Sequence, residues 1–110
     1  MDIVPETTAT ATIVPLQGQI NSANAAEAET RLLALVDGGA RKLVLDFAGL
    51  NYISSAGLRL VLVLAKRMKQ EGGRLVLCAM QPHVREVFEI SGFLAILDVQ
   101  ATRQDALAKF

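Results

Sequence analysis

Short apolar runs alternate along this chain with segments of helical periodicity, and paired glycines separate several of them. Residues 43–47 are nearly continuous in apolar side chains, as in a strand that is covered on both faces. A helical pattern then runs from Ser55 to about Gln70, Gly72 and Gly73 end it, and a second buried strand is expected at 74–79. Alternation of this kind predicts one α/β layer with a partly parallel sheet.

The same pattern extends to both ends of the chain. Residues 8–16 alternate and are rich in Thr, Ile and Val, which predicts a strand, and Pro5 and Pro15 favour an edge position. A helix capped by Asn21 or Ser22 is expected to run to the glycines at 38–39. Three further elements are expected: a helix at 82–90, a strand at 96–99 and a terminal helix at 102–109.

Length and charge narrow the class of protein. The 110 residues fit one domain, spanning 1–110, and the 52% of hydrophobic residues supply a core for it. Eleven basic and eleven acidic residues cancel without long runs of one sign, so we expect no direct nucleic-acid binding. Cys78 is the only cysteine, and no apolar run is long enough to span a bilayer. We therefore expect a cytoplasmic protein with no membrane insertion.

Residues for catalysis or metal binding are scarce. One Cys, one His and scattered carboxylates do not form a standard metal site, and no cofactor is predicted. A serine hydrolase would need the turn Gly-x-Ser-x-Gly, but Ile53 stands at the first glycine position before Ser55. His83, in the first turn of a predicted helix, has no evident catalytic partner. The sequence therefore favours a binding protein and not an enzyme.

The segment 47–59 joins a predicted strand to a predicted helix and is rich in small residues. Ser54 or Ser55 at the helix start places a hydroxyl beside unpaired backbone N–H groups, at the end of the helix dipole that favours negative charge. A phosphate would be tolerated at this position. Such serines also commonly serve only as helix caps, and the local residues leave both roles open.

Over almost its whole length the chain resembles the STAS domains of bacterial anti-sigma-factor antagonists. The resemblance centres on residues 43–47, Leu50 and the run from Tyr52 to Leu58, and it continues at 16–21, 72–78, 82–88 and 90–93. The family pattern is Asp-Ser followed by Ser, Thr or Ala and then Gly-Leu, and its phosphoacceptor follows the Asp. Ser55 occupies that position, whereas Ser54 and Asn21 stand where many members have Asp.

This resemblance implies a STAS fold, with a mixed sheet of four to five strands and about four helices. It also implies that the unmodified protein binds an anti-sigma factor, a serine kinase of GHKL type, and so releases a sigma factor. Phosphorylation by that kinase would inactivate the protein, and a phosphatase would restore it. Ser55 is the expected phosphoacceptor and Ser54 the second candidate. The expected partner-binding residues are Gly18, Ile20, Asn21, Ser22, Asn24, Tyr52, Ile53, Ser54, Ala56, Gly57, Leu58 and Arg59.

Two alternatives stay open at this point. A small cytosolic STAS subunit of a lipid or anion transport complex would share the fold without needing a phosphorylatable serine. The apolar stretch 58–64 is expected to pack on the sheet, although it also fits a docking face. Met80 and Phe93 are further interface candidates.

Overall fold

The computed structural model describes residues 2–110. Its strands are β1 (Glu6–Thr7), β2 (Thr12–Ile20), β3 (Lys42–Ile53), β4 (Arg74–Cys78) and β5 (Val99–Gln100). Its helices are α1 (Ala25–Asp37), α2 (Ser55–Gln70), α3 (Pro82–Ile90) and α4 (Arg103–Leu107), with a short 3-10 helix at Phe93–Ala95. The strands form one sheet in the order β1-β2-β3-β4-β5, in which only the β1–β2 pair is antiparallel. The predicted mixed sheet with four helices is confirmed.

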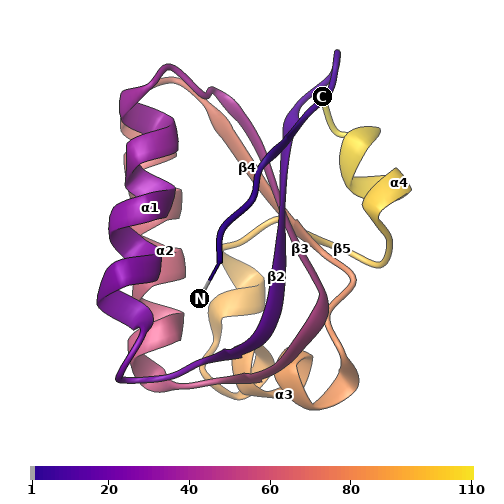
Figure 1. The fold of residues 1–110 in the computed structure, drawn as a ribbon. Helices are drawn as coiled ribbons and strands as arrows, with labels where there is room; N and C mark the ends of the chain where they lie inside the picture. The colour runs from indigo at the N-terminus through magenta and orange to yellow at the C-terminus, as the bar shows by residue number, and fades with distance from the viewer. Residues whose placement is uncertain (1) are drawn as a thin grey trace.

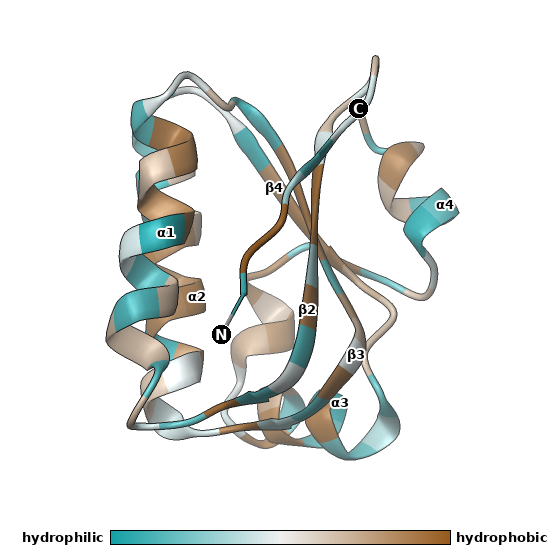
Figure 2. Cartoon of the chain, in the orientation of Figure 1, coloured by the Kyte–Doolittle hydropathy of each residue, from teal (hydrophilic) through white to brown (hydrophobic). Residues whose placement is uncertain are grey.

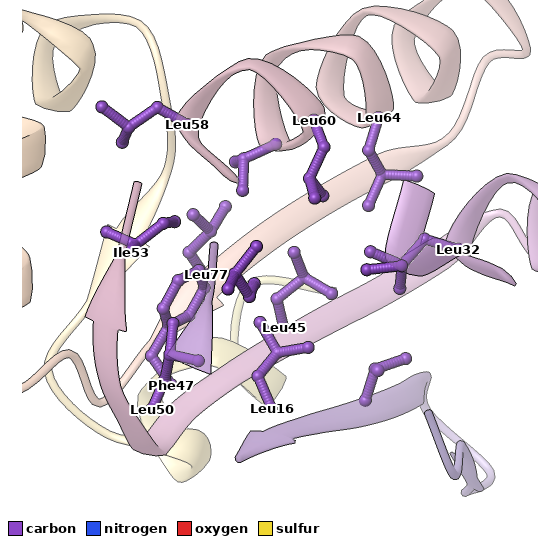
Figure 3. Close-up of a cluster of buried hydrophobic side chains, with 14 of the residues drawn as sticks. Leu16, Leu32, Leu45, Phe47, Leu50, Ile53, Leu58, Leu60, Leu64 and Leu77 are labelled. Atoms are coloured by element: carbon purple, nitrogen blue, oxygen red, sulfur yellow. The ribbon is translucent and has the colours of Figure 1, made fainter. Parts of the chain in front are cut away.

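Helices cover the sheet unequally (Figure 1). The larger core lies under α1, α2 and α3, where leucines of the sheet such as Leu16, Leu45 and Leu77 meet Leu60 and Leu64 of α2 (Figure 3). Phe47 and Phe88 form an edge-to-face pair with ring centroids 5.8 Å apart, which joins β3 to α3. Figure 2 shows the matching pattern on α1, whose hydrophilic residues lie on its outer side.

The opposite face of the sheet carries a smaller core, to which α4 contributes Ala106. Arg103 of α4 bonds the carboxylate of Asp46 through Nε at 2.9 Å and Nη2 at 2.7 Å, and it also pairs with Glu6 at 2.9 Å. Asp46 is only 7% exposed, so a cation on α4 compensates the one buried carboxylate of β3. This contact holds α4 and β1 on the sheet.

The first strand differs from its predicted bounds. Thr8 ends the two-residue β1 with a side-chain bond from its hydroxyl to the carbonyl of Ala11, and β2 then begins at Thr12. β2 is not an edge strand at its start, because β1 pairs with Thr12 and Ile13. Pro15 lies beyond that pairing, at a register shift between β2 and β3. Its missing N–H therefore costs no bond to β1.

Strand β3 is longer than predicted. The sequence suggested a strand at 43–47 followed by a loop, but the strand runs to Ile53. Leu50 and Ile53 are buried in the core while Ala48 and Gly49 are exposed, so burial no longer alternates regularly there. Gly49 fits because a Cβ at this position would lie 3.1 Å from the carbonyl oxygen of Leu16 in β2. The extension carries the chain directly to the start of α2.

Two other predicted boundaries are wrong. Helix α1 begins at Ala25 after a turn and is capped by neither Asn21 nor Ser22. The predicted strand at 96–99 is mostly a turn that follows the 3-10 helix and leaves Ile96 69% exposed, and of these residues only Val99 belongs to a strand, the two-residue β5. Within residues 2–110, no helix combines the length and the apolar character that crossing a bilayer requires.

Candidate functional site at the starts of helices α1 and α2

The carboxyl ends of β2 and β3 bring two distant segments of the chain together. In this parallel pair Gln19 lies opposite Tyr52 and Ile20 opposite Ile53. The backbone N–H of Ser54 continues the ladder by donating to the carbonyl of Ile20 at 2.8 Å. Both α1 and α2 begin just beyond this edge (Figure 1), so the starts of the two helices are neighbours.

Asparagine side chains fix the turn that precedes α1. The Oδ1 of Asn21 accepts from the backbone N–H groups of Ala23 at 2.9 Å and Asn24 at 3.1 Å. The Oδ1 of Asn24 accepts from the backbone N–H of Asn21 at 2.9 Å, and its Nδ2 donates to the carbonyl of Gln19 at 2.9 Å. Asn21 thus closes a local turn, which an amide does as well as a carboxylate.

Adjacent serines at the start of α2 have different surroundings. Ser54 is the N-cap, is half-buried, and accepts a hydrogen bond at Oγ from the backbone N–H of Gly57 at 3.2 Å. Ser55 is the first helical residue, is exposed, and its hydroxyl makes no hydrogen bond within residues 2–110. The hydroxyl of Ser55 is therefore accessible, whereas that of Ser54 is held by the helix.

Gly57, one of the small residues of segment 47–59, is required by packing. A Cβ at this position would lie 2.6 Å from Cγ1 of Ile53 and 2.8 Å from Cγ2 of Ile20. Both isoleucines are core residues, so neither has free space to move into. The glycine lets the first turn of α2 lie directly against the ends of β2 and β3.

A hollow of about 280 Å³ lies between the starts of the two helices. Its lining consists of Ser22, Ala25, Ala26, Glu29, Ala56 and Arg59. Ala25, Ala26 and Glu29 were not among the predicted site residues, because their contribution depends on α1 and α2 starting at the same sheet edge. A parallel pairing of the strands that precede both helices is the signal that could have indicated them.

The predicted partner-binding residues fall into two groups. Ile20, Ile53, Gly57 and Leu58 are buried, so they support this surface from beneath. The others are exposed or half-buried around the two helix starts. With Ser55 they form what we call the Ser55 patch: Gly18, Asn21, Ser22, Asn24, Tyr52, Ser54, Ser55, Ala56 and Arg59.

The remaining candidates from the sequence are His83, Met80 and Phe93, and all three make contacts within the fold. His83, for which the sequence suggested no catalytic partner, contacts the backbone carbonyl of Asn51 through Nε2. Gln81 donates from Nε2 to the carbonyl of Ala48 at 3.0 Å, so the start of α3 is attached to β3. Met80 and Phe93 are half-buried and pack against the main core.

Comparison with known proteins identifies the family to which this chain belongs. The STAS domain family matches residues 2–106. The chain belongs to the STAS family. A Bordetella bronchiseptica protein that carries the name anti-sigma factor antagonist BtrV is 58% identical over 98 residues, which cover 89% of this chain and 84% of that protein. The predicted resemblance is confirmed, and the predicted function agrees with the name of this relative.

Solved STAS structures share the fold at lower identity. A Thermotoga maritima protein described as an anti-sigma factor antagonist has a TM-score of 0.92 and 18% identity, and the match covers 97% of this chain and 92% of that one. The unphosphorylated form of the anti-sigma factor antagonist SpoIIAA has a TM-score of 0.81 and 23% identity, covering 98% of this chain and 95% of that one. SpoIIAA from Bacillus has also been solved in a phosphorylated form.

Proposed function

We propose that this STAS protein is an anti-sigma factor antagonist whose binding to an anti-sigma factor is switched off by phosphorylation of Ser55. The name of the 58% identical relative supports the class of function. The exposed, unbonded hydroxyl of Ser55 at the start of α2 is the observation that carries the switch. The protein acts in the cytoplasm as a regulator and not as an enzyme.

The proposed cycle has four steps. The unmodified protein binds an anti-sigma factor, a serine kinase of GHKL type, through the Ser55 patch, and a sigma factor is released. The kinase then transfers the γ-phosphoryl group of ATP to the Oγ of Ser55, and ADP and the phosphorylated antagonist are the products. The modified antagonist dissociates. A phosphatase hydrolyses the phosphoserine and returns the protein to its binding form.

Desolvation explains why one modification is sufficient. A hydroxyl is buried against a partner at little cost, whereas a phosphoserine carries about −1.5 to −2 charges that resist leaving water. A penalty of ~3 kcal/mol lowers affinity about a hundredfold, because each ~1.4 kcal/mol is a factor of ten. That change is large enough to move a partner from bound to free.

In this proposal the folded domain also tolerates a phosphate on Ser55. The N–H of Gly57 bonds Ser54, while the N–H groups of Ser55 and Ala56 make no hydrogen bond within residues 2–110. Those groups and the positive end of the α2 dipole favour a phosphate on Ser55. Phosphorylation is therefore expected to change partner binding without unfolding the domain.

Calorimetric titration against a candidate anti-sigma kinase tests the proposal. Wild type and Ser55→Ala are expected to bind within about threefold of each other, and Ser55→Asp about a hundredfold more weakly. Ser91→Asp is the matched control, because Ser91 is exposed at the far end of α3. Equal binding by Ser55→Asp and Ser91→Asp would refute the switch.

The transport-subunit alternative makes a different prediction. A subunit of a lipid or anion transporter would co-purify with an ATPase and a permease, and its binding would not change in Ser55→Asp. The relative named as an antagonist, which matches most of both chains, favours the regulatory function over this alternative.

A further inference from the structure

A second hollow lies along α2, away from α1. Its volume is about 430 Å³, and it is an open groove between α2 and the segment that follows the 3-10 helix. Side chains of α2 form one wall through Leu62, Val63 and Ala65, and the other wall contains Ile96 and Leu97. We call it the α2 groove.

Apolar side chains in the α2 groove are left in contact with water. Leu62, Val63 and Leu97 are only half-buried, and Ile96 is 69% exposed. The stretch 58–64 is thus divided: Leu58, Leu60, Val61 and Leu64 enter the core, whereas Leu62 and Val63 face the groove. Covering this apolar surface would be favourable, because it removes apolar side chains from water.

Three cations border the groove. Arg59, Lys66 and Lys69 line it, and their spacing along α2 places them on one side of the helix. Within residues 2–110 none of the three forms an ion pair. Arg67, on a different side of α2, pairs with both Asp37 and Glu71. Among the cations of α2, those without an ion pair within residues 2–110 are therefore the three that border the groove.

We propose that the α2 groove is a docking site for an acidic amphipathic helix of a partner protein. Arg59 and Lys69 are separated by about 15 Å along α2, at 1.5 Å per residue, which is the length of about three turns of a docked helix. Apolar residues at positions i, i+3, i+4 and i+7 of that helix would fill the groove, and flanking Asp and Glu would meet the three cations. An anionic membrane surface fits the concave shape less well, because lipid headgroups form a broad, flat layer.

The proposal is independent of Ser55 phosphorylation. Arg59 also lines the hollow of the Ser55 patch, so the two surfaces are continuous around the first turns of α2. One partner protein could therefore contact both. The experiment below contains no anti-sigma factor, so its failure would leave the proposed switch untouched.

Titration of the ¹⁵N-labelled protein with two synthetic peptides tests the groove. Both are 18-residue helical peptides with Leu at i, i+3, i+4 and i+7 of each repeat, and the other positions are mainly Glu in one and Lys in the other. The Glu peptide is expected to shift the amide signals of Leu62, Val63 and Leu97 and to bind at least tenfold more tightly than the Lys peptide. Equal affinities, no binding, or shifts confined to other surfaces would overturn the proposal.

Charge reversal supplies the control. Lys66→Glu with Lys69→Glu is expected to weaken the Glu peptide at least tenfold. Lys42→Glu with Arg85→Glu makes the same change in net charge at exposed positions outside the groove that form no ion pair in the described part of the chain, and is expected to weaken the Glu peptide less than twofold. Equal losses in the two variants would overturn the proposal. Binding to phosphatidylglycerol vesicles without binding to the Glu peptide would do the same and would assign the groove to membranes.

Discussion

Ser54 is the N-cap that precedes α2, and Ser55 is the first residue of α2. This difference in position gives their hydroxyl groups different surroundings. The cap hydroxyl of Ser54 accepts from Gly57, so modifying it would remove a bond that stabilises the helix start. The Ser55 hydroxyl has no such role and is exposed. This contrast supports the choice of Ser55 as the phosphoacceptor that the sequence resemblance implied.

Adding one methyl group at Gly57 is expected to destabilise the protein. Gly57→Ala places a Cβ within 2.8 Å of two buried isoleucine side chains. Overpacking of this kind costs about 1 to 3 kcal/mol in the free energy of unfolding, which urea denaturation measures. Gly38→Ala is the control, because its Cβ would come no closer than 3.4 Å to another atom. Equal stability of the two variants would show that the packing at Gly57 is not tight.

The thiol of Cys78 is expected to make stability fall at alkaline pH. Burial, with a smaller contribution from the Asp46 carboxylate, raises the pKa of the Cys78 thiol from 9.0 to about 11. Because the folded pKa exceeds the unfolded one, this contribution is complete below about pH 9 and is lost as pH rises through about 11. The loss amounts to about 2 to 3 kcal/mol.

Urea unfolding of wild type and Cys78→Ala at several pH values checks this expectation. The difference between the two proteins isolates the thiol, because every other ionisable group is present in both. The variant is expected to lose less stability than wild type between about pH 9 and 11. Parallel pH profiles would contradict a buried, perturbed thiol.

At the scale of elements, strand β3 shows where sequence reasoning stops. Residues 43–47 were predicted as a strand from their apolar run, but the extension to Ile53 depends on pairing with β2. The register shifts on either side of Gly18 change which residues face the core. A register shift is a property of the pairing between two strands. The spacing of apolar residues along β3 alone therefore did not indicate these shifts.

The attachment of helix α4 to the sheet includes the ion pair between Arg103 and Asp46. Arg103→Met would leave the carboxylate of Asp46 buried, and its remaining donor among the described residues would be the backbone N–H of Ala48 at 2.9 Å. We expect a loss of about 1 to 3 kcal/mol, below the full cost of breaking a buried pair because Arg103 is partly exposed. Hydrogen exchange should show faster exchange in α4.

A different arginine provides the comparison. Arg67 joins Asp37 at the end of α1 to Glu71 at the end of α2, and all three side chains are partly exposed. Arg67→Met is therefore expected to destabilise the protein less than Arg103→Met does, because pairs between exposed groups contribute little. If Arg67→Met destabilised the protein as much as Arg103→Met, burial of Asp46 would not be the reason for the strength of the Arg103 contact.

At the scale of the whole molecule, the fold was predictable and the surfaces were not. Alternating apolar runs and helical segments, with glycines between them, indicated the α/β sheet, and the resemblance indicated the family. The hollow beside Ser55 and the α2 groove each need two segments, 22–29 with 56–59 and 59–69 with 96–97. Ile96 illustrates the difficulty: its apolar neighbours predicted a strand, yet the chain turns there and exposes it.

The proposed switch depends on a phosphate at Ser55. Mass spectrometry with site mapping, after the protein is incubated with ATP and its partner kinase, measures this directly. We expect one added phosphate on Ser55, none in Ser55→Ala, and an unchanged phosphate on Ser55 in Ser54→Ala. Phosphate on Ser54 alone, or an unmodified protein that has bound its kinase with ATP present, would contradict the account.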